Sequence, residues 1–209
     1  MDSSVRLNLG CGSRPLPGYV NIDQDDLPTM RARYPTRVFD DSLVIKNFDI
    51  FKLPYADESV DEIHSESMLE HLSFEEEGKL FREIKRVLKP GGMVNLSVPN
   101  FEKLFQAWIE AKDEWKDFYR TDREAIESNH WFGHYSTKPD QRWGYLMASI
   151  FGNQNGSGQF HKNAYSIGKL RAIFEHMNFK VLEISEFLWQ GERDPMIRII
   201  GTKRALGKS

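Results

Sequence analysis

The sequence predicts an α/β fold with a mostly parallel sheet, and three observations support this. A first apolar run ends at Gly10 and Gly12, which is typical of a buried strand followed by a tight turn. A second short apolar run ends in the acid Asp23. Apolar residues at helical spacing over 74–88 are followed by a Pro-Gly-Gly turn and a third apolar run over 93–98. Alternation of strands and helices favours a parallel sheet.

Composition and charge limit the function classes. The chain has 209 residues, enough for one α/β domain, and a net charge of −3 with acids and bases interspersed. Without a lysine or arginine block or an apolar run of roughly 20 residues, we expect neither nucleic acid nor membrane as a partner. The first residues lack the pattern of a signal peptide, and the single cysteine, Cys11, excludes an intramolecular disulfide. A cytoplasmic location is therefore expected.

The glycine turn and the acid form half of a nucleoside pocket. The turn lets a ligand approach bare backbone, and Asp23 at the end of the next strand can accept hydrogen bonds from both ribose hydroxyls. Dinucleotide binders have a third glycine where Pro15 stands here, which argues against NAD and FAD. A nucleoside ligand without a pyrophosphate does not need this third glycine, and S-adenosylmethionine (SAM) is the common ligand of that kind.

Four stretches, in order along residues 5–100, resemble class I SAM-dependent methyltransferases, in particular small type 11-like members. They are Leu-Asn-Leu-Gly-Cys-Gly at 7–12 with Asn-Ile-Asp at 21–23, Asp-Ile with Leu-Pro-Tyr within 49–55, the segment 59–72 that ends in Leu-Glu-His-Leu, and Leu-Lys-Pro-Gly-Gly at 88–92. The resemblance implies a Rossmann-like class I fold. We thus expect one domain over 1–209, with a seven-stranded, mostly parallel sheet and an antiparallel C-terminal hairpin at its edge.

The other elements follow from periodicity and breakers. The expected strands are 5–9, 19–22, 44–48, 60–65, 93–98, 180–187 and 196–202, and the expected helices are 27–34, 74–88, 101–115 and a helix that begins after Ser166 and ends at 177. Class I members usually place a helix after the first strand, but two prolines and a glycine between 13 and 18 predict a loop. A family subset linked to glycan or envelope chemistry is similar in this segment.

The resemblance implies cofactor-binding roles for eight residues. They are Gly10, Cys11, Gly12, Asp23, Asp49, Ile50, Ser65 and Glu66. Asp23 would bind the ribose, Asp49 would lie near the adenine amine, and Glu66 would pair with the SAM ammonium. Simpler roles stay open, because Asp23 can be a turn or cap acid, Asp49 can cap a turn, and Glu66 can be a solvated acid at a helix start.

Methyl transfer from SAM needs alignment and, for a hydroxyl or ammonium nucleophile, removal of a proton. Histidine suits that task, because its unperturbed pKa is about 6.5. His161 is the first candidate base, since it follows the polar loop 152–159 and precedes a helix start. His134 and His71 come next. For His71, a structural role at a helix start is the alternative.

Residues 101–160 are rich in aromatic side chains and are expected to form a substrate lid. Enzymes of this family usually build a lid after the fifth strand, and aromatic residues suit a planar or cationic acceptor. His130 and His134 have the spacing of two metal ligands on one helix face, but their segment lacks a helical pattern and a third ligand. We therefore expect no metal site.

Taken together, these features indicate a SAM-dependent methyltransferase that acts on an O or N nucleophile of a small molecule or sugar. One alternative is an aminopropyltransferase on the same fold, which would use decarboxylated SAM and need extra acids near its amine. Another is a non-catalytic SAM-binding subunit, which would bind SAM without turnover. A protein- or RNA-methylating enzyme is disfavoured, since no Asn/Asp-Pro-Pro-Tyr motif follows the fourth strand.

Overall fold

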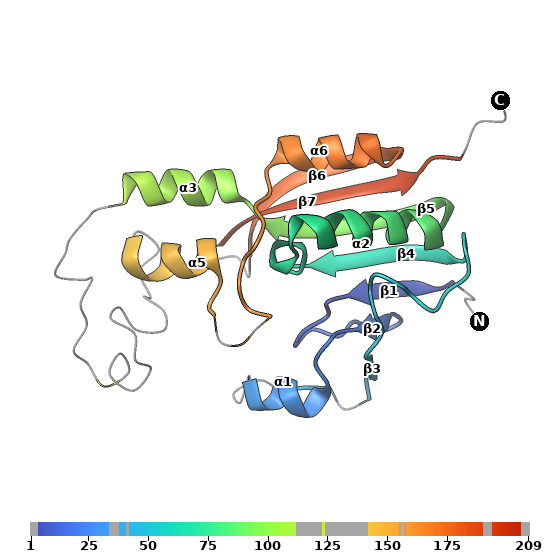
Figure 1. The fold of residues 1–209 in the computed structure, drawn as a ribbon, viewed down its shortest axis with the longest axis horizontal. Coiled ribbons are helices and arrows are strands. Elements are labelled where there is room, and N and C mark those ends of the chain that lie inside the picture. The colour runs from blue at the N-terminus through green and yellow to red at the C-terminus, as the bar shows by residue number, and fades with distance from the viewer. Residues whose placement is uncertain are drawn as a thin grey trace.

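The structure is a computed structural model that describes residues 4–33, 38–40, 42–111, 123, 142–154, 156, 158–189 and 194–205. Within these residues one sheet has the strand order β3-β2-β1-β4-β5-β7-β6 (Figure 1). Its strands are β1 (Arg6–Leu9), β2 (Val20–Ile22), β3 (Ile45–Lys46), β4 (Val60–Glu66), β5 (Leu88–Pro99), β6 (Phe179–Trp189) and β7 (Asp194–Lys203). β1 to β5 pair in parallel, and β7 pairs antiparallel with both β5 and β6. The predicted fold class is confirmed.

The helices lie on the sheet and beyond one of its ends. They are α1 (Leu27–Arg33), the 3-10 helix η1 (Leu69–His71), α2 (Phe74–Val87), α3 (Phe101–Glu110), the π-helical turn η3 (Arg142–Leu146), α5 (Met147–Phe151) and α6 (Ile167–His176). Figure 1 shows α3 and α5 side by side, past the ends at which the arrows of β4 and β5 point. In the part of the chain that the structure describes, none of the helices has the length and hydropathy of a membrane span.

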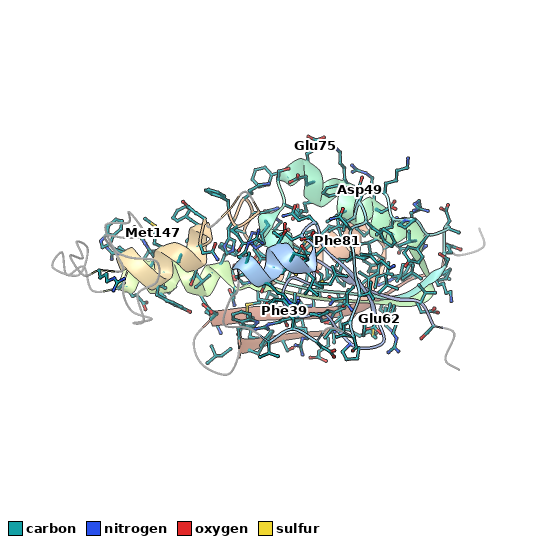
Figure 2. The ribbon with its side chains drawn as sticks, turned by 90° about the horizontal axis from the view of Figure 1, so that it is seen from below. Phe39, Asp49, Glu62, Glu75, Phe81 and Met147 are labelled. Atoms are coloured by element: carbon teal, nitrogen blue, oxygen red, sulfur yellow. The ribbon has the colours of Figure 1, made fainter. Side chains whose placement is uncertain are left out.

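Helix α2 shows why the central elements were predictable. Ser73 and Glu76 form a capping box, and three acids in the first turn with two bases in the last turn suit the helix dipole. Figure 2 labels Phe81, which is buried between α2 and the sheet, and Glu75, which points outward. The helix ends at Val87 rather than at 88, because β5 begins at once.

Several predicted boundaries were wrong. β5 takes in the Pro-Gly-Gly segment as an irregular start next to β4, and Gly91 there has a φ of +80°. β3 has only two residues, because it is an edge strand that pairs with the three-residue β2. β6 and β7 are longer than expected, since their pairing continues to Trp189 and Asp194. α3 ends at Glu110, before the predicted end at 115.

The segment between β1 and β2 has no helix, as the prolines predicted. Two buried asparagines hold it instead. Asn8 donates to the Asn21 side chain at 2.9 Å, and that side chain accepts from the Leu16 backbone at 2.7 Å. Asn21 also donates to the Leu16 carbonyl at 3.1 Å. This network fixes the loop that leads away from the glycine turn.

Candidate active site

A cavity of about 740 Å³ lies where β1, β2 and β4 end, which is where open α/β sheets bind ligands. The predicted site residues that line it are Gly10, Cys11, Gly12, Asp23, Asp49, Ile50, Glu66, His71 and His161. Ser65 is not in the lining, because its buried hydroxyl donates to the Leu9 carbonyl at 2.9 Å and ties β4 to β1. His134 lies outside the described residues.

Asp23 organises the glycine turn. One of its carboxylate oxygens accepts from the Gly12 amide at 2.8 Å, and the other accepts from the Asp25 amide at 3.0 Å. Burial raises the pKa of Asp23 above its usual value. Gly10 and Gly12 have φ values of +63° and +50°, which glycine adopts readily. The carboxylate thus holds the turn in shape while it lines the cavity.

The cavity lining near the glycine turn also includes a buried thiol, a turn-capping acid and two apolar side chains. Cys11 is buried, and burial raises the pKa of its thiol to about 12, so the thiol stays protonated. Asp49 is exposed and caps a turn, since one of its oxygens accepts from the Phe51 amide at 2.8 Å. Phe48 and Ile50 on either side of Asp49 are partly buried and line the cavity, so an apolar surface lies beside an acid.

Two residues that sequence reasoning missed stand beside Glu66. The guanidinium of Arg14 forms an ion pair with Glu66 at 2.9 Å and lies 4.2 Å over the ring of Trp189. The Trp189 indole donates to the same Glu66 oxygen at 3.2 Å. All three line the cavity. The position of Arg14 just after the glycine turn could have indicated that it lines the site. Nothing in the sequence indicates that Trp189, so far along the chain, also lines it.

Glu70, His71 and His161 form a further cluster in the lining of the cavity. The rings of His71 and His161 are 4.8 Å apart, edge to face. Burial lowers the pKa of both imidazoles, for His161 to about 4, and so keeps them neutral. Glu70 was not predicted as a site residue. Its side chain is 1% exposed, and burial raises its pKa to about 8.

The wall beyond the histidines comes from α3 and from the segment 142–151. Leu104, Tyr145 and Ile150 belong to a small buried cluster, separate from the main core. Leu104, Tyr145 and Ser149 also line the cavity, so this part of the predicted lid region borders the site. The intervening residues 112–122 and 124–141 lie outside the described part of the chain.

Comparisons with known proteins agree with this geometry. The family model of the methyltransferase domain matches residues 7–96, and a SAM-dependent methyltransferase of Methanosarcina mazei has the same fold, with a TM-score of 0.59. Residues 7–96 form a methyltransferase domain of the class I type. The matched segment is that of an enzyme domain, and the solved structures that share its fold include SAM-dependent methyltransferases.

The methyltransferase fold extends well beyond the matched segment. The Methanosarcina protein is 16% identical, and the match covers 99% of this chain and 95% of that one. The 1,6-didemethyltoxoflavin-N1-methyltransferase of Burkholderia thailandensis, solved with that compound and S-adenosylhomocysteine, has a TM-score of 0.54 at 12% identity, over 97% and 72% of the two chains. An uncharacterized protein of Haemophilus influenzae is 32% identical over 75 residues, which span 36% of this chain and 30% of that protein.

Proposed function

We propose that the methyltransferase domain transfers the methyl group of SAM to an oxygen or nitrogen nucleophile of a small molecule or sugar. The observation that carries the proposal is the cavity itself, which is lined both by the glycine turn with Asp23 and by two neutral histidines. A volume of about 740 Å³ leaves room for a small acceptor beside the donor.

The donor half of the cavity offers a partner for each part of SAM. Asp23 accepts from the ribose hydroxyls, and the apolar surface at Phe48 and Ile50 lies against the adenine. For the amino-acid end, Glu66 binds the ammonium group and Arg14 binds the carboxylate. In support of this assignment, Glu66 and Arg14 both line the cavity and pair with each other at 2.9 Å, so an acid and a base are available together for such a zwitterion.

Replacing Asp23 by alanine is expected to weaken SAM binding by roughly 1.5–3 kcal/mol, the range for hydrogen bonds to a charged group. Calorimetric titration with SAM measures this, and a parallel titration of the wild type with NAD is expected to show no binding. The matched control is Asp26→Ala, since Asp26 is exposed and outside the cavity lining. Unchanged SAM affinity in Asp23→Ala removes Asp23 from the ribose role.

Replacing Arg14 by glutamine is expected to weaken SAM binding by roughly 10- to 150-fold, because the SAM carboxylate loses its charged partner. Affinity for 5′-methylthioadenosine, which lacks the amino-acid end, is expected to stay within about twofold. Equal losses for both ligands would show that Arg14 only supports the loop. The same titration with decarboxylated SAM tests the aminopropyltransferase alternative, since tighter binding of that donor than of SAM by the wild type would favour it.

The acceptor half is formed by the histidines and by the wall from α3 and α5. We assign removal of the acceptor proton to the cluster of Glu70, His71 and His161. We interpret the wall as part of the predicted substrate lid, within a single domain over residues 1–209. The test is formation of S-adenosylhomocysteine during a screen of alcohols, amines and sugars. Binding of SAM without turnover on any of them would favour the non-catalytic alternative.

A further inference from the structure

The cluster of Glu70, His71 and His161 has the composition of a cation site. Each residue offers one ligand atom, and these atoms all lie within 4.8 Å of one another. Two distant segments are joined to produce it. The amides of Lys162 and Asn163 donate to the Glu70 carbonyl at 2.8 and 3.1 Å, which fixes the second segment against η1.

Both imidazoles are oriented by backbone carbonyls. Nδ1 of His71 is 3.1 Å from the Phe160 oxygen, and Nδ1 of His161 is 3.1 Å from the Ser149 oxygen. Because a carbonyl only accepts, each Nδ1 carries the proton and each Nε2 keeps a lone pair. Histidines that bind metals in proteins are held in the same way, with the second nitrogen donating to a carbonyl or carboxylate.

The carboxyl group of Glu70 gives independent support for a ligand at this cluster. Its side chain is buried, and its Oε2 has no hydrogen-bond partner among the described residues. A buried polar atom normally has a partner, because an unpaired one loses its hydration without compensation. No arginine or lysine pairs with this carboxyl among the ion pairs of the described residues. A cation between Glu70 and the two Nε2 atoms would satisfy it.

We propose that Glu70, His71 and His161 bind a divalent transition-metal cation of the Zn²⁺ type through one carboxylate oxygen and two imidazole nitrogens. Two histidines and a glutamate are an established zinc ligand set that leaves a coordination position open, and His71 and His161 both line the cavity. The proposal departs from the sequence-based expectation of no metal, which considered only His130 and His134. The ligands escaped notice because two are adjacent and the third is far along the chain.

The inference rests on the proposed function and narrows its acceptor to an oxygen nucleophile. A bound cation lowers the pKa of a hydroxyl group that it binds, so proton loss to solvent needs no side-chain base. An oxygen lone pair then forms the C–O bond, and the C–S bond breaks with its electron pair going to sulfur, which yields S-adenosylhomocysteine. In this arrangement His71 and His161 are ligands rather than bases.

The test is titration of the chelator-treated full chain with Zn²⁺, followed by calorimetry, and with Co²⁺, followed by visible absorption. One ion per chain is expected. Glu70→Gln, His71→Ala and His161→Ala are each expected to weaken Zn²⁺ binding more than the roughly 100-fold that loss of an outer partner can cost. His176→Ala, at an exposed histidine of α6, is the matched control and should bind Zn²⁺ like the wild type.

The outcomes separate this inference from the proposed function. Asp23→Ala is expected to lose SAM affinity and keep Zn²⁺, whereas His71→Ala should do the reverse. No stoichiometric ion in the wild type, or equal Zn²⁺ affinity in the wild type and His71→Ala, overturns the metal site even if SAM binds. Since the wild-type titration stands by itself, poor folding of a Glu70 variant does not spoil the test.

Discussion

Replacing His161 by alanine is expected to slow methyl transfer by about 10²–10⁴-fold and to leave SAM affinity within about twofold. The imidazole lines the cavity, and its Nδ1 donates to the Ser149 carbonyl, so only Nε2 is available to act on an acceptor. The loss is expected whether that lone pair takes the acceptor proton directly or binds a cation that acidifies the hydroxyl. The rate of S-adenosylhomocysteine formation at saturating SAM, together with calorimetry, measures both quantities.

Two comparisons make this result interpretable. His176→Ala removes an exposed imidazole outside the cavity and should leave turnover unchanged. Chelator treatment of the wild type should reproduce the His161→Ala defect only if the cluster acts through a metal. A variant that loses SAM affinity as strongly as turnover would place His161 in the donor half, and full turnover in His161→Ala would exclude it from catalysis.

The fold was predictable because its signals are local. The capping box of Ser73 and Glu76 and the apolar stripe at Leu80, Phe81 and Ile84 lie within one helix and need no knowledge of the rest of the chain. The same holds for the glycine turn and for the loop that replaces the usual helix after β1. Strand ends were less predictable, since pairing decides them, as the extension of β6 and β7 shows.

The residues of the proposed donor half were predictable where they follow the end of a strand, but not where two distant segments of the chain meet. Asp23 directly follows β2, so topology alone brings it to the glycine turn. Ser65, in contrast, is a buried residue of β4, and its hydroxyl donates to the Leu9 carbonyl. Arg14 contacts Trp189, the last residue of β6, although β6 lies at the far edge of the sheet from β1. A contact between such distant segments has no local sequence signal.

Glu70 shows the physical limit of sequence reasoning about sites. A single acid in a short segment before α2 is normally expected to be solvated. It is buried because its own carbonyl accepts the amides of Lys162 and Asn163, which bring a remote segment over it. Tyr165 adds to this closure, since its hydroxyl donates to Glu77 of α2 at 2.6 Å. None of these contacts leaves a periodic signal.

Replacing Gly10 by alanine is expected to destabilise the fold by about 2–5 kcal/mol, a larger effect than the same change at Gly12. Gly10 has a φ of +63°, at which a side chain costs roughly 1–2 kcal/mol. The new Cβ would also stand 2.2 Å from Cγ and 2.7 Å from Cβ of Met68. Met68 is buried and its Cβ is fixed to the backbone before η1, so the strain of roughly 1–3 kcal/mol cannot be relieved by a rotamer change.

Gly12→Ala is the matched control, because Gly12 also has a positive φ but a Cβ there would meet no protein atom within 4 Å. Its cost in the free energy of unfolding, measured by urea denaturation, should stay near 1–2 kcal/mol, which is the backbone part alone. Its methyl group would instead project into the cavity, so SAM affinity should fall while the fold persists. Equal stability losses in the two variants would mean that Met68 moves freely and does not restrict the backbone at Gly10.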